Sequence, residues 1–185
     1  ICKEKFRALS TLGVSFTSYA SGQNLTWPFV TMNDFQQRAA SAREVSNALY
    51  TQILPIISGE NKEKWEEYSV ANKGWLDEAR AYQQELGLQE TLGQQLRPLE
   101  PVTKDSTLDF SSGIGNKIYS FDLETFLPVA STSPPDYYPI WQQSPVTDRD
   151  LVNWNLVEFF SFGPFIQVCA ATGDVVIGGF DVFPP

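Results

Sequence analysis

From Glu60 to Gly87 the chain reads ENKEKWEEYSVANKGWLDEARAYQQELG. Aromatic and other apolar side chains recur every three or four residues in this stretch, which is the spacing that lines one face of an α-helix. That face consists of Trp65, Tyr68, Asn72, Trp75, Ala79, Tyr82 and Leu86. The pattern predicts one long amphipathic helix that ends at Gly87 and places Trp65 and Trp75 in the hydrophobic core.

Two more helices are predicted upstream. Residues 1–22 carry a narrow stripe at alternating steps of four and three, and Gly22 ends it. Such a stripe fits either a seam with a second copy of the chain or a helix that lies on its own domain. The next helix is expected to open at Thr31 and Asp34, which resemble a capping box. The two helix faces are Cys2, Phe6, Leu9, Gly13, Phe16 and Ala20, and then Phe35, Ala39, Ala42 and Val45.

Strand signals are found mainly in the rest of the chain. Runs rich in β-branched and aromatic residues, bounded by Gly, Pro and polar turns, predict strands. Strands are expected over 48–57, 117–122, 125–130 and 174–183, the second and third forming a hairpin. A short helix over 165–171 and a long surface connection over 88–116 complete the expected elements.

The order of these elements predicts the fold class. At 185 residues the chain has the usual size of one domain. Helices come first and strands mostly later, so we expect an α+β domain in which a long amino-terminal helix precedes an antiparallel sheet. Sensor domains with a PAS-like sheet have this layout.

Composition narrows the range of functions. The formal net charge of −9 repels phosphate backbones, so nucleic-acid binding is not expected. The chain contains no histidine, which excludes Ser–His–Asp catalysis and His-ligated metal sites. No apolar run approaches the roughly 20 residues of a membrane-spanning helix. Any membrane attachment is therefore expected through segments absent from this chain.

Motifs for catalysis are scarce. The acidic residues that could pair are Glu66, Glu67, Asp148 and Asp150. Nothing in their spacing sets two of them across a cleft, so a solvated acidic surface is expected instead. The glycines of the segment 111–115 lack the lysine of a phosphate-binding loop. We therefore expect no enzyme activity, no metal site and no cofactor.

One group of residues after the hairpin has the composition of a pocket. Aromatic walls with a few amide donors and acceptors suit an uncharged small molecule. The candidate ligand-binding residues are Tyr138, Pro139, Trp141, Gln142 and Asn155. The same residues have a structural alternative, in which the rings fill the core and the amides cap turns.

Three positions bear on the cellular compartment. Asn24 opens the glycosylation sequon Asn24-Leu25-Thr26, which favours an extracellular location. Cys2 and Cys169 could form a disulfide in an oxidising compartment or remain two thiols. The chain starts at Ile1 without an initiator Met or a signal-peptide pattern, so we expect it to be a part of a longer polypeptide.

Several strings of the sequence resemble a known family. These strings are FVTMNDF at 29–35, WEEYSVANKGW at 65–75, YPIWQQSP at 138–145 and NWN at 153–155. They are similar to the extracellular region of diatom receptor-type nucleotide cyclases. That region is in turn similar to CHASE domains, the sensory ectodomains of cyclase and histidine-kinase receptors. The resemblance covers about residues 27–180.

The resemblance implies a division of the chain and a function. Residues 1–26 become a membrane-proximal signalling helix, and residues 27–185 a PAS-like domain that binds a small molecule or peptide outside the cell. The helix relays binding to a cytoplasmic guanylate or adenylate cyclase, and a homodimer through residues 1–22 is a further expectation. The main alternative is an extracellular adhesion or protein interaction domain without a small-molecule ligand. A hydrolase with paired carboxylates is the third hypothesis.

Overall fold

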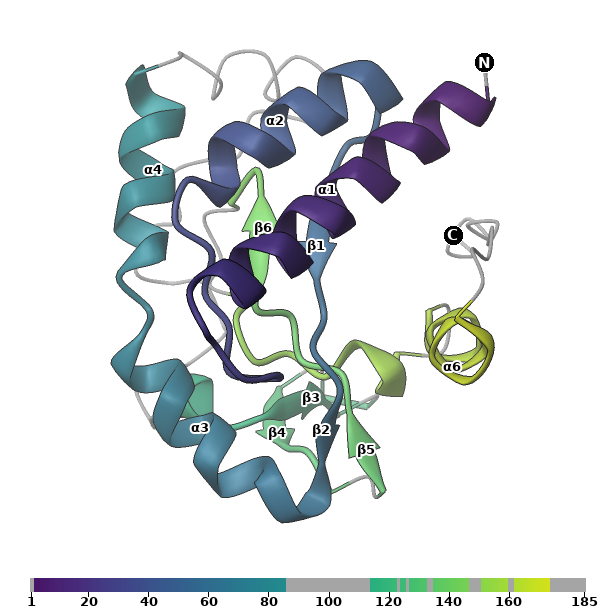
Figure 1. Cartoon of the computed structure of the whole chain (residues 1–185). Coiled ribbons are helices and arrows are strands. Elements are labelled where there is room, and N and C mark those ends of the chain that lie inside the picture. Colours follow the sequence, from purple (N-terminus) through teal and green to yellow (C-terminus); the bar gives the residue numbers. More distant parts are fainter. Residues whose placement is uncertain are drawn as a thin grey trace.

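The computed structural model describes residues 2–85, 114–122, 124–125, 127–132, 135–146, 151–159 and 162–173. Within these residues the chain combines α-helices with short antiparallel strand pairs, which confirms the predicted α+β class. Helices α1 to α4 surround one side of the strands, and α6 lies on the opposite side from α3 and α4 (Figure 1).

The long helix predicted over 60–86 is in fact two helices. α3 spans Lys62–Ala71 and α4 spans Trp75–Glu85, with a 3₁₀ turn at Gly59–Asn61 before α3. At the break the side-chain amide of Asn72 donates to the carbonyl of Tyr68 at 2.9 Å, and Gly74 follows. Asn competes for backbone groups and Gly leaves the backbone free, so both residue types disfavour a continuous helix. The helix axis changes direction there (Figure 1).

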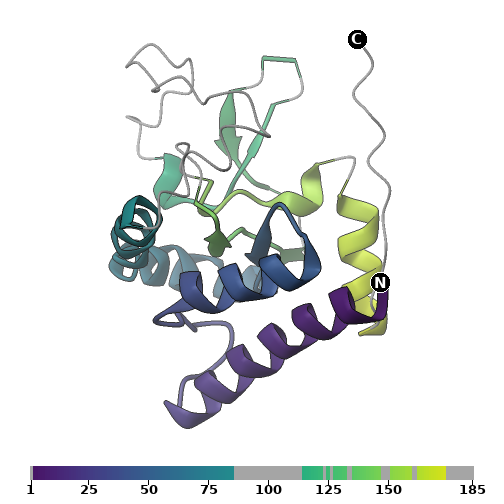
Figure 2. The ribbon, with the colours of Figure 1, turned by 90° about the horizontal axis from the view of Figure 1, so that it is seen from above.

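The two upstream helices form as predicted. α1 spans Cys2–Gly22 and α2 spans Phe35–Ser46, and α2 lies between α1 and α4 (Figures 1 and 2). The predicted face of α1 is wrong in its first part, because Leu9 is 39% exposed and Gly13 faces solvent. The carboxy-terminal half of α1 packs against the fold through Leu12, Phe16 and Ala20, while the first turns of α1 extend past the end of α2 (Figure 1). Of the two arrangements expected for this helix, the described half of α1 shows the one in which the helix lies on its own domain.

The predicted capping box of α2 does not form. Asp34 has a left-handed backbone, with φ of 54°, and makes no capping hydrogen bond with its side chain. The hydroxyl of Thr31 instead hydrogen bonds to the hydroxyl of Tyr68 at 2.7 Å. Val45 is expected on the buried face of α2 but is 63% exposed. The buried face of the helix passes through Ala42 and Ser46 instead.

The strand predicted over 48–57 is split into two short strands. β1 spans Thr51–Ile53 and pairs with β6, Gln142–Ser144, while β2 spans Ile57–Ser58 and pairs with β5, Asp136–Tyr137. Pro55 lies between β1 and β2, and its missing N–H cannot serve a sheet ladder. One segment therefore joins two strand pairs.

The predicted hairpin is confirmed. β3, Tyr119–Phe121, pairs antiparallel with β4, Pro128–Ala130, so that Ser120 lies opposite Val129. At the turn the carboxylate of Asp122 accepts the backbone N–H and the hydroxyl of Thr125, each at 2.8 Å. These hydrogen bonds lower the pKa of Asp122.

The carboxy-terminal helix is also confirmed. α6 spans Gly163–Thr172 and ends at Gly173, whose φ of 71° suits glycine. Shorter 3₁₀ turns lie at Ile114–Asn116 (η3) and Leu156–Glu158 (η4). The predicted strand over 174–183 and most of the predicted connection over 88–116 lie outside the described residues. The described strands form two-stranded sheets, and a PAS-like sheet stays a prediction.

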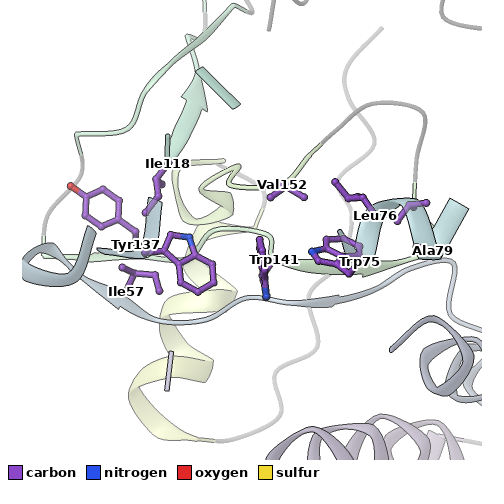
Figure 3. Close-up of a cluster of buried hydrophobic side chains, with 10 residues drawn as sticks. Ile57, Trp75, Leu76, Ala79, Ile118, Tyr137, Trp141 and Val152 are labelled. Carbon is purple, nitrogen blue, oxygen red and sulfur yellow. The ribbon is translucent and has the colours of Figure 1, made fainter. Parts of the chain in front are cut away.

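Two hydrophobic clusters hold these elements together. The aromatic core joins α3, α4 and the strands, and Trp141 lies in it beside Trp75 (Figure 3). The helical core joins α1 and α2 to the segment before α2. The aromatic core consists of Ile57, Trp65, Trp75, Leu76, Ala79, Ile118, Tyr137, Trp141, Val146 and Val152. The helical core consists of Leu12, Phe16, Ala20, Val30, Met32, Phe35, Ala39 and Ala42.

Candidate functional site

The two amides of the predicted pocket are fully buried and bind backbone groups. Gln142 accepts the N–H of Met32 at 2.8 Å through Oε1 and donates to the carbonyl of Met32 at 2.9 Å through Nε2. Asn155 accepts the N–H of Tyr138 at 2.8 Å and donates to the hydroxyl of Ser131 at 3.0 Å. A ligand at either amide must therefore displace an internal hydrogen bond, which costs free energy.

The other three residues of the predicted pocket are buried or half-buried in the fold. Trp141 and Pro139 are fully buried, and the indole N–H of Trp141 donates to the carbonyl of Val30 at 2.9 Å. Tyr138 is half-buried, and its burial raises the pKa of its hydroxyl. Their contacts match the structural alternative, with rings in the core and amides that fix the backbone. Of the five residues, Gln142 lines the cavity between α2 and α4.

This cavity, here called the α2–α4 cavity, has a volume of about 200 Å³. An engineered apolar cavity of about 150 Å³ is large enough to bind benzene, so a ligand of one ring fits here. The start of α2 and the residues before it supply Met32, Asp34, Phe35, Gln36 and Gln37. The helix α4 supplies Trp75, Glu78, Ala79 and Tyr82, and β6 supplies Gln142.

The walls of the cavity combine fixed and free groups. Gln36 donates to the backbone carbonyl of Gln143, so this amide is fixed to β6. Asp34 forms an ion pair with Arg38 at 3.1 Å, one turn further along α2. Glu78 is exposed at the rim, and it makes no ion pair within the described part of the chain. The fixed groups shape the cavity, and the free carboxylate is available to a ligand.

Two residues belong both to the cavity wall and to the packing of α1. Phe35 and Met32 line the cavity and are members of the helical core. The ring of Phe35 meets the ring of Phe16 edge to face, with a centroid distance of 6.4 Å. Phe16 lies on the buried face of α1. Phe35 therefore contacts both the cavity and the buried face of α1.

The acidic residues considered for catalysis do not all lie on a solvated surface. Glu66 is 5% exposed, which corrects the prediction for this residue. Its carboxylate accepts the N–H of Ile118 at 3.0 Å and the ammonium of Lys117 at 2.9 Å. These bonds fix the start of β3 to α3, since a buried carboxylate needs partners. Glu67 is exposed as expected, and residues 148 and 150 lie outside the described residues.

The positions that bear on the compartment are only partly described. Asn24 is exposed in a left-handed turn just after α1, with φ of 55°. A glycan can therefore reach its amide. Cys169 lies on α6, is intermediate in exposure and forms no disulfide within the described residues. The side chain of Cys2 lies outside the described part, so the pairing with Cys169 stays a prediction.

The described part of the chain offers few other candidate sites. Within the described residues no helix is both long enough and apolar enough to span a bilayer, and no three acidic, Cys or His side chains form a metal-binding group. No protein-family model, curated protein or solved structure matches this chain. The α2–α4 cavity is thus the feature on which a functional proposal rests.

The sequence contained a signal for this cavity. Its α4 wall faces α2 because the chain turns at residues 72–74, and Gly74 in a helical pattern marks such a turn. Trp75 and Ala79 were predicted only as core residues of one long helix. Both are buried, and both also border the cavity.

Proposed function

We propose that this chain is a ligand-sensing domain, which binds a small molecule in the α2–α4 cavity and relays binding to α1. The observation that carries the proposal is the wall shared by the cavity and the helical core. Phe35 borders the cavity on one side and packs against Phe16 of α1 on the other. A ligand that contacts Phe35 therefore acts on the contact that positions α1.

The relay requires a helix with more than one accessible position. A ligand shifts such an equilibrium only as far as it prefers one position over the other. The contacts of α1 with α2 are apolar, through Leu12, Phe16 and Ala20, and apolar contacts have no fixed direction. Small displacements of α1 along α2 thus cost little compared with breaking hydrogen bonds.

In the whole protein we place this domain outside the cell, in a receptor with a cytoplasmic nucleotide cyclase. The resemblance of residues 29–35, 65–75 and 138–145 to the ectodomains of diatom receptor-type cyclases supports this placement. The exposed sequon at Asn24 supports the extracellular location. The PAS-like, CHASE-like assignment of the sheet is the finer part of the same proposal, and an experimental structure of the complete domain tests it.

The extracellular placement has a direct test. Expression in a glycosylating host should add mass to the chain, and Asn24→Gln should remove that mass. Mass spectrometry of both proteins makes the comparison. A wild-type chain without a glycan after passage through the secretory pathway would count against this part of the proposal.

The site and the relay are tested together by ligand screening. A thermal-shift screen of small metabolites should yield a stabilising compound, since a ligand at about 100 times its Kd adds about 2.7 kcal/mol. Ala79→Leu fills the cavity and should abolish this stabilisation, whereas the matched change Ala81→Leu, on the exposed side of α4, should not. Bound compound should also change hydrogen exchange over residues 12–20. Unchanged exchange in α1 would refute the relay.

One observation supports the adhesion hypothesis. Large apolar side chains are exposed around the end of α2, with Val45 at 63%, Leu49 at 50% and Tyr50 at 37%. Exposed apolar patches mark protein interfaces. If a partner protein is captured by the wild-type chain but not by Val45→Asp, while no small molecule stabilises the domain, the adhesion hypothesis is favoured.

A further inference from the structure

The α2–α4 cavity has a charge pattern that selects among ligands. Its lining includes two carboxylates, Asp34 and Glu78, and no lysine or arginine among the described residues. Arg38 and Arg43 lie on α2 close by, but neither lines the cavity. A cavity lined in this way attracts cations and repels anions, and the net charge of −9 adds to the effect.

The two carboxylates differ in what they can offer a ligand. The charge of Asp34 is partly neutralised by Arg38, whose guanidinium lies 3.1 Å from it. Glu78 makes no ion pair within the described residues. It lies in the first turn of α4, at the rim of the cavity. Glu78 is therefore the counter-ion that remains available to a bound cation.

The aromatic walls favour the same class of ligand. Three of the residues that line the cavity, Phe35, Trp75 and Tyr82, are aromatic. A cation is attracted to the face of an aromatic ring, most strongly to that of Trp, and an apolar ligand group gains from burial against the same rings. The volume of about 200 Å³ limits the ligand to about one ring with a short chain.

We infer that the α2–α4 cavity binds a small organic ammonium ion, with the charged nitrogen at Glu78 and the apolar part between Phe35, Trp75 and Tyr82. This inference rests on the proposed function, because it names the ligand class of the same cavity. It disfavours carboxylates and phosphate esters of the same size, which the carboxylate of Glu78 would repel.

A set of three probes of similar size tests the charge preference. Benzylammonium, benzyl alcohol and benzoate share one ring and differ in charge, and ligand-observed NMR titration measures their binding to the same protein. Benzylammonium should bind with a Kd in about the millimolar range or tighter, as the ceiling on affinity per atom allows. Benzyl alcohol should bind several-fold more weakly, and benzoate should not bind.

Variants assign the preference to the cavity. Glu78→Gln removes the rim charge with little change in shape and should weaken benzylammonium about 3-fold to 10-fold without affecting benzyl alcohol. Glu67→Gln is the matched control, because it removes one exposed charge on α3, outside the cavity lining, and should leave both affinities unchanged.

The outcomes separate this inference from the proposed function. If Glu78→Gln weakens the binding of benzylammonium and Glu67→Gln does not, the ammonium inference is supported. Equal binding of all three probes, or equal effects of the two variants, overturns the ammonium inference but leaves a cavity that binds ligands. If none of the probes binds, both the ligand class and the cavity as the sensing site are overturned.

Discussion

α3 and α1 both bury one face, yet they are attached to the domain by different forces. In α3 the indole N–H of Trp65 donates to Asn153 at 3.0 Å, and the carboxylate of Glu66 accepts the N–H of Ile118 at 3.0 Å. From Phe6 onward, no side-chain hydrogen bond or ion pair joins α1 to another element within the described residues. From Phe6 onward, the described side chains that attach α1 to the domain do so through apolar contacts.

The difference separates a helix held in one geometry from a helix whose contacts allow small shifts. Hydrogen bonds between buried groups require one geometry, because a misplaced donor or acceptor is left unsatisfied at a cost of about 1–3 kcal/mol. Apolar contacts tolerate small shifts and are well suited to an element with two positions. Under the proposed function, α3 belongs to the rigid part of the domain, and α1 is the element that responds to a ligand in the cavity.

The largest expected effect compares one buried ring from each helix. Trp65→Ala should lower the free energy of unfolding by about 3–5 kcal/mol, because it empties the centre of the aromatic core. Phe16→Ala should cost less, about 3 kcal/mol or below, because α1 can shift to close the space. Urea unfolding of both variants checks this, and equal costs would break the comparison.

A matched pair of indoles isolates the hydrogen bonds of α3. Trp65→Phe loses a donor and leaves Asn153 without it, whereas the buried N–H of Trp75 has no partner among the described residues. Both changes remove a similar volume. Trp65→Phe should therefore cost about 1–3 kcal/mol more than Trp75→Phe in urea unfolding. The opposite ranking would show that packing, and not hydrogen bonding, fixes α3.

The ion pair of α3 should make stability depend on alkaline pH. The hydrogen bond to Glu66 raises the pKa of Lys117 above its ordinary value of 10.5. The pair therefore stabilises the fold fully below pH 10.5, and this contribution is lost as the pH rises through the raised pKa. Unfolding experiments across this range should show a smaller loss for Lys117→Met. Tyr68, whose pKa is raised by burial, adds a loss in the same direction in both proteins.

The smallest effect is expected at the free end of α1. Deleting residues 1–10 should change stability by about 0.5 kcal/mol or less, because the described side chains from Phe6 to Ser10 are not buried. Extending the deletion to residue 20 removes Leu12, Phe16 and Ala20 and should destabilise the domain strongly. Thermal unfolding compares the two truncations. Similar melting temperatures would mean that α1 contributes nothing to the core.

The sequence predicted the elements better than their arrangement. Periodicity located α1, α2, α6 and the hairpin, because these patterns are local. It missed the turn at Gly74, since the apolar spacing continues across it, and it missed the split at Pro55, because two strand pairs share one apolar run. The ligand-binding role predicted for Tyr138, Pro139, Trp141, Gln142 and Asn155 stays a prediction. Composition does not reveal that Gln142 and Asn155 are already bonded to the backbone.

The close packing of indoles in the aromatic core gives the domain a built-in optical signal. Trp141 lies 5.2 Å from Trp65 and 5.9 Å from Trp75, measured between ring centroids. Chromophores this close share their excited states, so the near-ultraviolet circular dichroism and the emission of the cluster depend on their mutual orientation. Trp75 also borders the α2–α4 cavity. Occupation of the cavity should therefore alter the intrinsic fluorescence of the unlabelled protein, which allows binding to be followed without a dye.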